Sequence, residues 1–193
     1  MTSESLAFES EIISASSPRL NYPVLNLALQ PIDSSNLAIK DFNEAYMGQL
    51  TAIIEALRLK GAFTSDDLLL ASDGIKEKLE NRQGYEVKVA EFNGLAIGFI
   101  CYSKVPSSDR SYELYWLAVH PSMQGRGIGT SLLVEAEKDI KAKGGKTIIL
   151  DTTSKEGYAS ARHLYEKSGY RIVSRIDRLY SEKEDHLTYR KDL

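Results

Sequence analysis

Apolar residues follow two different periods along this chain, and the change of period separates the predicted elements. Runs in which apolar and polar residues alternate, ended by Gly, Pro or Asn, are typical of strands. Runs in which apolar residues recur every three or four positions are typical of helices with one buried face. The predicted strands cover residues 24–32, 85–92, 95–105, 111–119, 146–153, 170–180 and 185–193. The predicted helices cover residues 36–61, 65–84, the stretch between Gly129 and Gly144, and 157–169.

The order of these elements, β-α-α-β-β-β-α-β-α-β-β, predicts an α/β (α+β) fold. Asn93-Gly94 separates two strands by two residues, which is the strongest short signal for a β-hairpin. The second half alternates strand, helix, strand and helix, which favours a parallel pair. We therefore expect a mixed sheet.

Length and composition place these elements in one soluble domain. A chain of 193 residues with 42% apolar and 26% charged residues can form a complete core without staples. Residues 1–23 are Ser-rich and acidic, and Pro18 and Pro23 mark their end, so we expect a mobile leader there. Residues 24–193 are expected to form the single domain.

Charge and cysteine content exclude several classes of partner. A net charge of −3 gives the chain no general attraction to nucleic acid or to anionic membranes. Cys101 is the only cysteine, so an intrachain disulfide is excluded. The chain starts with neither a signal peptide nor a membrane anchor, which predicts a cytoplasmic protein. No metal site is expected, because His120, His163 and His186 lack ligand spacing.

Three glycines, Gly125, Gly127 and Gly129, stand at alternate positions where a strand passes into a helix. The first turn of a helix has about four N–H groups without intrahelical partners, at the positive end of the helix dipole. Bare glycines would let a phosphate approach these donors. The alternative is a tight turn packed against a neighbouring strand.

Two familiar phosphate motifs do not fit this stretch. The dinucleotide motif G-x-G-x-x-G has Thr130 where its last glycine belongs. The sequence GGKT at 144–147 has Ile140 where a P-loop begins with glycine, and a predicted strand follows it. Nucleotide hydrolysis is therefore not expected.

The motif that fits is Q-x-x-G-x-G, from Gln124 to Gly129. It resembles the acyl-coenzyme A loop of the GNAT family of N-acetyltransferases. The stretches LAVHPSMQGRGIGTSLL and ARHLYEKSGYRIV extend this resemblance over roughly residues 85–193, whereas the first eighty residues match only in element order. The resemblance implies a mixed, mostly antiparallel central sheet with helices on both faces, and acetyl-CoA as co-substrate.

The resemblance also implies the residues that bind acetyl-CoA. Main-chain N–H groups of the glycine loop would hold the pyrophosphate, and the strand before it would pair with the pantetheine arm. Tyr158 stands where many members have an asparagine that helps to bind the coenzyme. Ser160 or Arg162 would replace the contact of that asparagine, or the contact would be lost. Alternatively, Tyr158 would face the acceptor. The Arg126 side chain would contact a phosphate or point to solvent. The implied cofactor-binding residues are Leu117, Ala118, Val119, Gln124, Gly125, Arg126, Gly127, Ile128, Gly129, Thr130, Tyr158 and Arg162.

Two residues are candidates for the chemistry. By the period of two, Glu113 shares a strand face with Tyr115, Leu117 and Val119, and the resemblance implies that it is the general base. A solvated strand start is the alternative. Tyr165 matches the family's tyrosine near the coenzyme sulfur, where it would stabilise the thiolate; otherwise it is a core aromatic.

The function predicted from these residues is acetyl-CoA-dependent acetylation of a primary amine on a small molecule, by direct attack of the amine on the thioester. Tyr112, Tyr115 and Trp116 would suit a small organic amine. Two alternatives stay open: acetylation of a protein or peptide, and a non-catalytic module that binds acyl-CoA. A homodimer is also left open.

Overall fold

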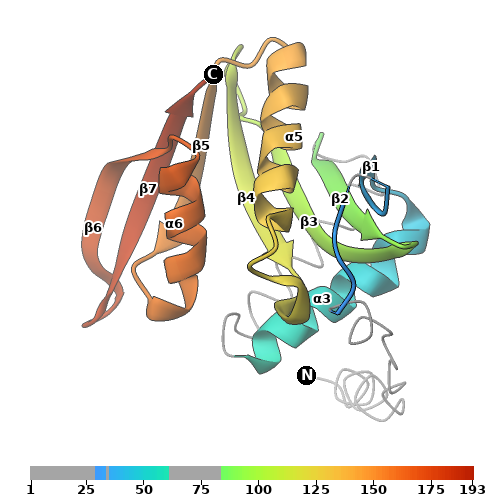
Figure 1. Cartoon of the computed structure of the whole chain (residues 1–193). Helices are drawn as coiled ribbons and strands as arrows, with labels where there is room; N and C mark the ends of the chain where they lie inside the picture. The colour runs from blue at the N-terminus through green and yellow to red at the C-terminus, as the bar shows by residue number, and fades with distance from the viewer. Residues whose placement is uncertain (1–28, 34, 61–83) are drawn as a thin grey trace, which may run out of the picture.

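A seven-stranded sheet forms the centre of the molecule in the computed structural model, which describes residues 29–33, 35–60 and 84–193 (Figure 1). Its strand order is β1-β2-β3-β4-β5-β7-β6. All neighbouring strands are antiparallel except β4 and β5, which confirms the predicted mixed, mostly antiparallel sheet. The strands are β1 (Leu37–Asp41), β2 (Glu86–Phe92), β3 (Leu95–Lys104), β4 (Ser111–Val119), β5 (Thr147–Thr153), β6 (Arg171–Ser181) and β7 (Glu184–Asp192).

Helices cover both faces of this sheet (Figure 1). On one face, α3 (Met47–Leu59) buries Leu50, Ile53, Ile54 and Leu57, a spacing that gathers them on one side of the helix. On the other face, α5 (Ile128–Ala142) and α6 (Ala159–Lys167) pack on a second core. Short 3-10 helices precede α3 (Glu44–Tyr46) and α6 (Glu156–Tyr158) and follow β4 (Pro121–Met123).

The N-terminal part of the sequence prediction was partly wrong. Residues 37–41 were expected at the start of a helix over 36–61, but they form β1 and pair with β2 from Leu37–Phe92 to Asp41–Lys88. The helical segment starts later, with the 3-10 turn that precedes α3. Asn43 caps this turn, because its side chain accepts a hydrogen bond from the Ala45 N–H at 3.0 Å. Pairing with a distant strand therefore outweighed local helical spacing.

Other N-terminal predictions fall partly or wholly outside the described residues. These are the leader over 1–23 and most of the helix over 65–84. The predicted strand over 24–32 is described only from residue 29, and residues 29–32 form a turn and a bend followed by irregular chain, without strand pairing.

The predicted hairpin between β2 and β3 is confirmed. Asn93 and Gly94 both have positive φ, 51° and 81°. A two-residue hairpin turn of this type requires left-handed backbone at both positions, which Asn and Gly tolerate best. The hairpin places β3 in the middle of the sheet, where residues 96–103 are all buried.

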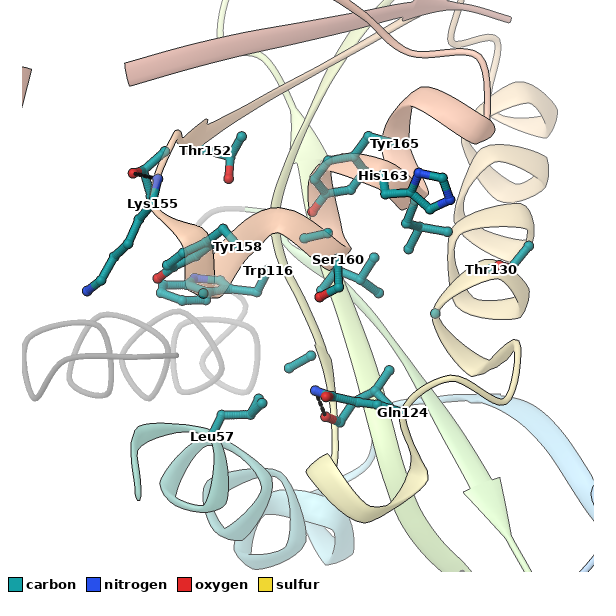
Figure 2. Close-up of a pocket in the computed structure, with 18 of the residues that line it drawn as sticks. Leu57, Trp116, Gln124, Thr130, Thr152, Lys155, Tyr158, Ser160, His163 and Tyr165 are labelled. Carbon is teal, nitrogen blue, oxygen red and sulfur yellow. Dashed lines mark hydrogen bonds between the residues drawn. The ribbon is translucent and has the colours of Figure 1, made fainter. Parts of the chain in front are cut away.

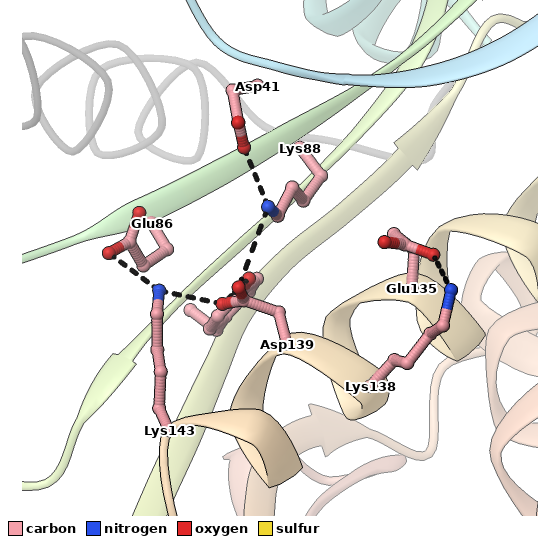
Figure 3. A network of polar contacts seen from close by, with 8 residues as sticks. Asp41, Glu86, Lys88, Glu135, Lys138, Asp139 and Lys143 are labelled. Carbon is pink, nitrogen blue, oxygen red and sulfur yellow. Dashed lines mark hydrogen bonds and ion pairs between the residues drawn. The ribbon is translucent and has the colours of Figure 1, made fainter.

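At the end of the sheet away from the glycine loop, an ion-pair network joins α5 to β1 and β2 (Figure 3). Lys88 lies 2.6 Å from Asp41 and 3.7 Å from Asp139, and Lys143 lies 2.7 Å from Asp139 and 2.9 Å from Glu86. The Tyr102 hydroxyl donates to Asp139 at 2.7 Å. The network holds the C-terminal half of α5 against the strands.

Strand β6 closes the other edge of the sheet. It pairs only with β7, and all of its residues are exposed, including Ile172, Val173, Ile176, Leu179 and Tyr180. Whether two copies of the chain associate is not decided by these features, so the homodimer stays a prediction.

Candidate active site

The sheet opens between its two parallel strands. Pairing of β4 with β5 runs only from Ser111–Thr147 to Leu114–Leu150, although β4 continues to Val119 and β5 to Thr153. The two strands diverge beyond that point (Figure 1). Pairing of this strand with a pantetheine arm, which the family resemblance implies, needs such an opening, and the sequence did not reveal it.

A β-bulge marks the start of the opening. Tyr102 pairs with Leu114 and Cys101 pairs with Trp116, so Tyr115 is the extra residue of β4. It directly follows the last residue that pairs with β5. The bulge therefore coincides with the point where the edge of β4 turns away from β5.

A cavity of about 920 Å³ occupies this opening (Figure 2). Its size is at the upper end of the range for small-molecule and cofactor pockets, roughly 300–1,000 Å³. Residues from the end of β4, the glycine loop, the end of β5 and one side of α6 line it. The predicted site residues among them are Leu117, Ala118, Val119, Gln124, Gly125, Gly127, Ile128, Gly129, Thr130, Tyr158 and Tyr165.

The glycine loop directs main-chain donors toward this cavity. Gly127 is the N-cap of α5 with φ 81°, and the first main-chain bond of the helix runs from the Ser131 N–H to the Gly127 carbonyl at 3.0 Å. The N–H groups of Ile128, Gly129 and Thr130 therefore precede the intrahelical bonds, at the positive end of the dipole. This arrangement fits an anion.

The three glycines have different structural reasons. Added Cβ atoms at Gly125 and Gly127 would meet nothing within 4 Å, but both residues have positive φ, at 75° and 81°. A Cβ at Gly129 would lie 3.1 Å from the Leu164 side chain on α6. The left-handed backbone explains why the first two positions are glycine. Close packing, the alternative explanation of the motif, explains Gly129.

Tyr165 lies in the wall of the cavity, and its hydroxyl points into it (Figure 2). Its ring lies 5.9 Å from the rings of both Tyr170 and Tyr189, and 7% of the residue is exposed. Burial raises the pKa of Tyr165 far above its usual value, and the neighbouring Tyr189 and Tyr158 raise it further. At neutral pH the hydroxyl is therefore a hydrogen-bond donor.

The prediction that Glu113 shares a strand face with Leu117 and Val119 was wrong. Tyr112 and Leu114 belong to the core under α5, and beyond the bulge Leu117 and Val119 pack against that same core, whereas Ala118 belongs to the core under α3. The extra residue at the bulge shifts the alternation by one. Glu113 therefore lies on the sheet face of Ala118, opposite to Leu117.

Glu113 is not among the residues that line the cavity, but its neighbour Tyr115 is. Burial raises the pKa of Tyr115 to about 12; a hydrogen bond from Ser103 at 3.3 Å opposes this, and the nearby Glu113 carboxylate adds to it. Tyr115 thus lies both beside Glu113 and in the wall of the cavity. The sequence did not indicate this position for Tyr115.

Residues 51–170, more than half of the chain, match the sequence model of the Acetyltransferase (GNAT) family. The chain belongs to the GNAT family. This assignment confirms the predicted family and the predicted class of enzyme, an acetyltransferase.

Known proteins similar to this GNAT enzyme agree with the assignment. The L-methionine sulfoximine/L-methionine sulfone acetyltransferase of Salmonella typhimurium is 26% identical over 144 residues, 72% of this chain and 83% of the relative. A GNAT-family structure from Desulfovibrio desulfuricans has a TM-score of 0.73 at 27% identity, covering 81% of this chain and 98% of its own. A Salmonella typhimurium acetyltransferase solved with acetyl-CoA has a TM-score of 0.66 at 21% identity, covering 82% and 94%, which shows the shared fold.

The Arg126 side chain of the GNAT loop turns away from the cavity. Its guanidinium donates to the Gln30 carbonyl and to the Met123 sulfur at 3.4 Å, and it lies 5.9 Å from the centre of the Phe92 ring. The side chain is therefore not directed purely to solvent, and its contact with a phosphate stays a prediction. It braces the loop against Gln30 and the end of β2.

Arg162 also has a bracing role. Its guanidinium donates to the carbonyls of Thr153 and Lys155, both at 2.7 Å, and it does not line the cavity. These bonds tie α6 to the chain that leaves β5. Arg162 therefore contacts the main chain at the end of β5, while Tyr158 and Ser160 line the cavity.

Several lining residues of the GNAT cavity were not predicted. They are Leu57 from α3, residues 151–153 and Lys155 at the end of β5, His163 and Lys167 from α6, and Tyr180 and Glu184 from the β6–β7 hairpin. The predicted helix over 157–169 does place positions 160, 163, 164 and 167 on one face, so a signal for two of them was present.

No helix among the described residues is both long and apolar enough to cross a bilayer. No group of three or more His, Cys, Asp or Glu side chains in the described ranges is arranged to hold a metal ion.

Proposed function

We propose that this GNAT acetyltransferase uses acetyl-CoA to acetylate a primary amine on a small molecule. The observation that carries the proposal is the opening of β4 from β5 beside the N-terminus of α5, with the Tyr165 hydroxyl directed into the space between. An anion site, a strand edge and a hydroxyl donor then line one cavity. An acyl donor with a pyrophosphate, an amide-containing arm and a thioester needs these three features in that order.

The residues present fit such a donor. The N–H groups between Gly125 and Thr130 would hold the pyrophosphate. The edge of β4 from Leu117 to Val119 would pair with the amides of the pantetheine arm, as an added strand does. At its end, the Gln124 side-chain amide donates to the Val119 carbonyl at 3.1 Å and keeps the loop against the strand (Figure 2). When bound, acetyl-CoA supplies an activated acyl group.

The acceptor must lose a proton before it can attack. An amine with a pKa of about 10.4 is about 4.6 kcal/mol from neutrality at pH 7. We assign the base to Glu113, which reaches the cavity through the Tyr115 hydroxyl or an intervening water. The carboxylate accepts the proton, and the neutral nitrogen forms the new bond to the carbonyl carbon.

Charge then moves to the carbonyl oxygen and to sulfur. Main-chain N–H groups at the free edge of β4 would stabilise the oxygen. Tyr165 would donate a hydrogen bond to the departing thiolate. Because its pKa is raised far above that of a thiol, about 8.5, the proton stays on Tyr165. As the C–S bond breaks, the new amide nitrogen loses its second proton to solvent, and solvent returns a proton to the thiolate.

The acceptor end of the cavity favours a small amine with an apolar body. Leu57, Tyr115, Trp116 and Tyr158 contribute apolar and aromatic surface there. The Salmonella typhimurium relative acts on amino-acid analogues, which are amines of that size. The cytoplasmic location remains a prediction beside this proposal.

The proposal is tested in two steps. Thermal unfolding is followed with acetyl-CoA, CoA, NADH and ATP; a ligand at a hundredfold over its Kd adds about 2.7 kcal/mol, so a shift of a few degrees is expected with the two coenzyme A species alone. Release of the CoA thiol is then measured with small amines and with peptides. Turnover only with peptides would contradict the small-molecule acceptor, and no shift with coenzyme A would contradict the donor.

A further inference from the structure

The charged residues that line the cavity form two groups, one at each end of it. Asp151, Glu184 and Lys155 lie where β5 meets the β6–β7 hairpin, whereas His163 and Lys167 lie on α6. Figure 2 shows His163 on the same side of the cavity as Thr130, and Lys155 on the side of Thr152. The end beside the glycine loop is therefore the basic one.

Packing between two helices sets the position of the basic pair. Leu164 of α6 lies against Gly129 in the first turn of α5, 3.1 Å from where its Cβ would be. His163 precedes Leu164, and Lys167 follows one turn after His163, so both side chains project from the part of α6 beside that first turn. The N–H groups at the start of α5 and the two basic side chains thus flank the same mouth of the cavity.

The acidic residues around this mouth have other partners. Glu166 of α6 accepts a hydrogen bond from the Tyr189 hydroxyl at 2.8 Å, and Glu137 of α5 pairs with Lys191 at 2.6 Å. At the opposite end, Asp151 lies 3.2 Å from His186. Within the described part of the chain, no carboxylate forms an ion pair with Lys167 or His163. The basic pair is thus available to an anionic ligand.

We propose that Lys167 and His163 bind a second phosphate, the 3′-phosphate on the ribose of the coenzyme. This inference rests on the proposed function, because coenzyme A carries that monoester on the ribose next to its pyrophosphate. With the pyrophosphate at the N–H groups between Gly125 and Thr130, the ribose lies at the mouth that α6 borders. A lysine ammonium attracts a phosphate as a point charge, and an imidazole N–H adds a donor.

The consequence is discrimination between coenzyme A and its 3′-dephospho form. The two ligands share the pyrophosphate, the pantetheine arm and the thiol, so only a group near the 3′ position can distinguish them. An exposed charge pair contributes modestly, so we expect CoA to bind about five- to tenfold more tightly than dephospho-CoA at low salt. The ratio should fall as salt screens the pair.

Calorimetric titration of the full chain with both ligands tests this site. Lys167→Gln is expected to weaken CoA binding about fivefold and to leave dephospho-CoA unchanged, and His163→Gln should act in the same direction. Lys155→Gln is the matched control, because it removes a positive charge from the opposite end of the same cavity. It should not change the ratio. Unchanged unfolding midpoints would show that the exposed substitutions left the fold intact.

Each other result contradicts a specific statement. Equal affinity of the wild-type protein for CoA and dephospho-CoA would overturn the 3′-phosphate site and leave the proposed function in place. Equal weakening of both ligands by Lys167→Gln would also overturn it, since the residue would then act on the shared part of the ligand. Binding of neither ligand would overturn the proposed function, and the phosphate site with it.

Discussion

Leu164 of α6 lies against Gly129 of α5, with its Cδ2 atom 3.1 Å from the position of a Cβ on that glycine. Both residues line the cavity, so this contact sets the separation of the two helices that border it. The glycine motif therefore has a packing role in addition to the proposed ligand-binding role.

Gly129→Val should force these helices apart. Overpacking of this kind typically costs about 1–3 kcal/mol in the free energy of unfolding. Leu164→Ala makes room for the new side chain, so the double variant should lose less stability than the sum of the two single variants. Urea unfolding of all four proteins measures this coupling. Strict additivity would show that the two side chains do not compete for the same space.

Gly127→Asn distinguishes the role of Gly127 in the conformation of the loop from its role in ligand binding. The left-handed backbone at φ 81° is strained for most residues, but Asn tolerates it. We expect a change of less than about 1 kcal/mol in stability and a loss of at least about tenfold in acetyl-CoA affinity, because the side chain now projects beside the N–H groups. Gly127→Val should lose both stability and affinity for acetyl-CoA. Wild-type affinity in the Asn variant would contradict the anion site.

Tyr165→Phe should reduce kcat about 10- to 100-fold with little change in KM, because a hydrogen bond to a charged group is worth about 1.5–3 kcal/mol. The pKa of Tyr165 is raised by burial, so the defect should be constant from pH 6 to 9, where the hydroxyl stays protonated. Tyr170→Phe is the control, since Tyr170 lies 5.9 Å away but does not line the cavity. Equal defects in both variants would indicate a packing effect.

Glu113→Gln tests the assignment of the base. Loss of a general base typically lowers the rate about 10²- to 10⁴-fold. If the proton passes along the Tyr115 hydroxyl, Tyr115→Phe should lower kcat by a similar factor, and the double variant should be no slower than Glu113→Gln. A more acidic ammonium acceptor should rescue part of the rate. Wild-type kcat in Glu113→Gln would exclude it as base.

Asp139→Asn should destabilise the protein by about 1–3 kcal/mol, because Lys88, Lys143 and Tyr102 lose their shared partner (Figure 3). Burial alone would raise the pKa of Asp139, but hydrogen bonds from Lys143 and Tyr102 outweigh it and lower the pKa. The contribution is therefore complete above the unfolded pKa, about 3.9, and is lost as the pH falls through the folded value.

Chemical unfolding between pH 7 and pH 3 measures this difference. The gap in stability between the wild type and Asp139→Asn should narrow toward the acid end. Glu135→Gln is the control on the same helix, since among the described residues Glu135 pairs with the exposed Lys138 alone, at 3.3 Å. It should change stability by less than about 0.5 kcal/mol. A gap that stays constant to pH 3 would contradict the assigned role of the Asp139 charge.

Local patterns in the sequence were sufficient for much of the fold. Asn93-Gly94 determines its hairpin because only a few residues accept left-handed backbone at both turn positions. The spacing of Leu132, Leu133, Ala136 and Ile140 determines the buried face of α5, because helix geometry places them together. The loop from Gln124 to Gly129 was recognisable for the same reason: its residues act through their own backbone.

Long-range contacts decided what such patterns leave open. Residues 37–41 became a strand because β2 offered hydrogen bonds to their backbone. The bulge at Tyr115, produced by the register between β3 and β4, moved Glu113 to the other face of the sheet. The guanidinium of Arg126 donates to a carbonyl 96 residues away, and that of Arg162 donates to carbonyls at the end of another strand. The sequence by itself determined most of the elements and the glycine loop, whereas tertiary structure decided which side chains reach the cavity, because long side chains and strand registers depend on partners that local spacing does not specify.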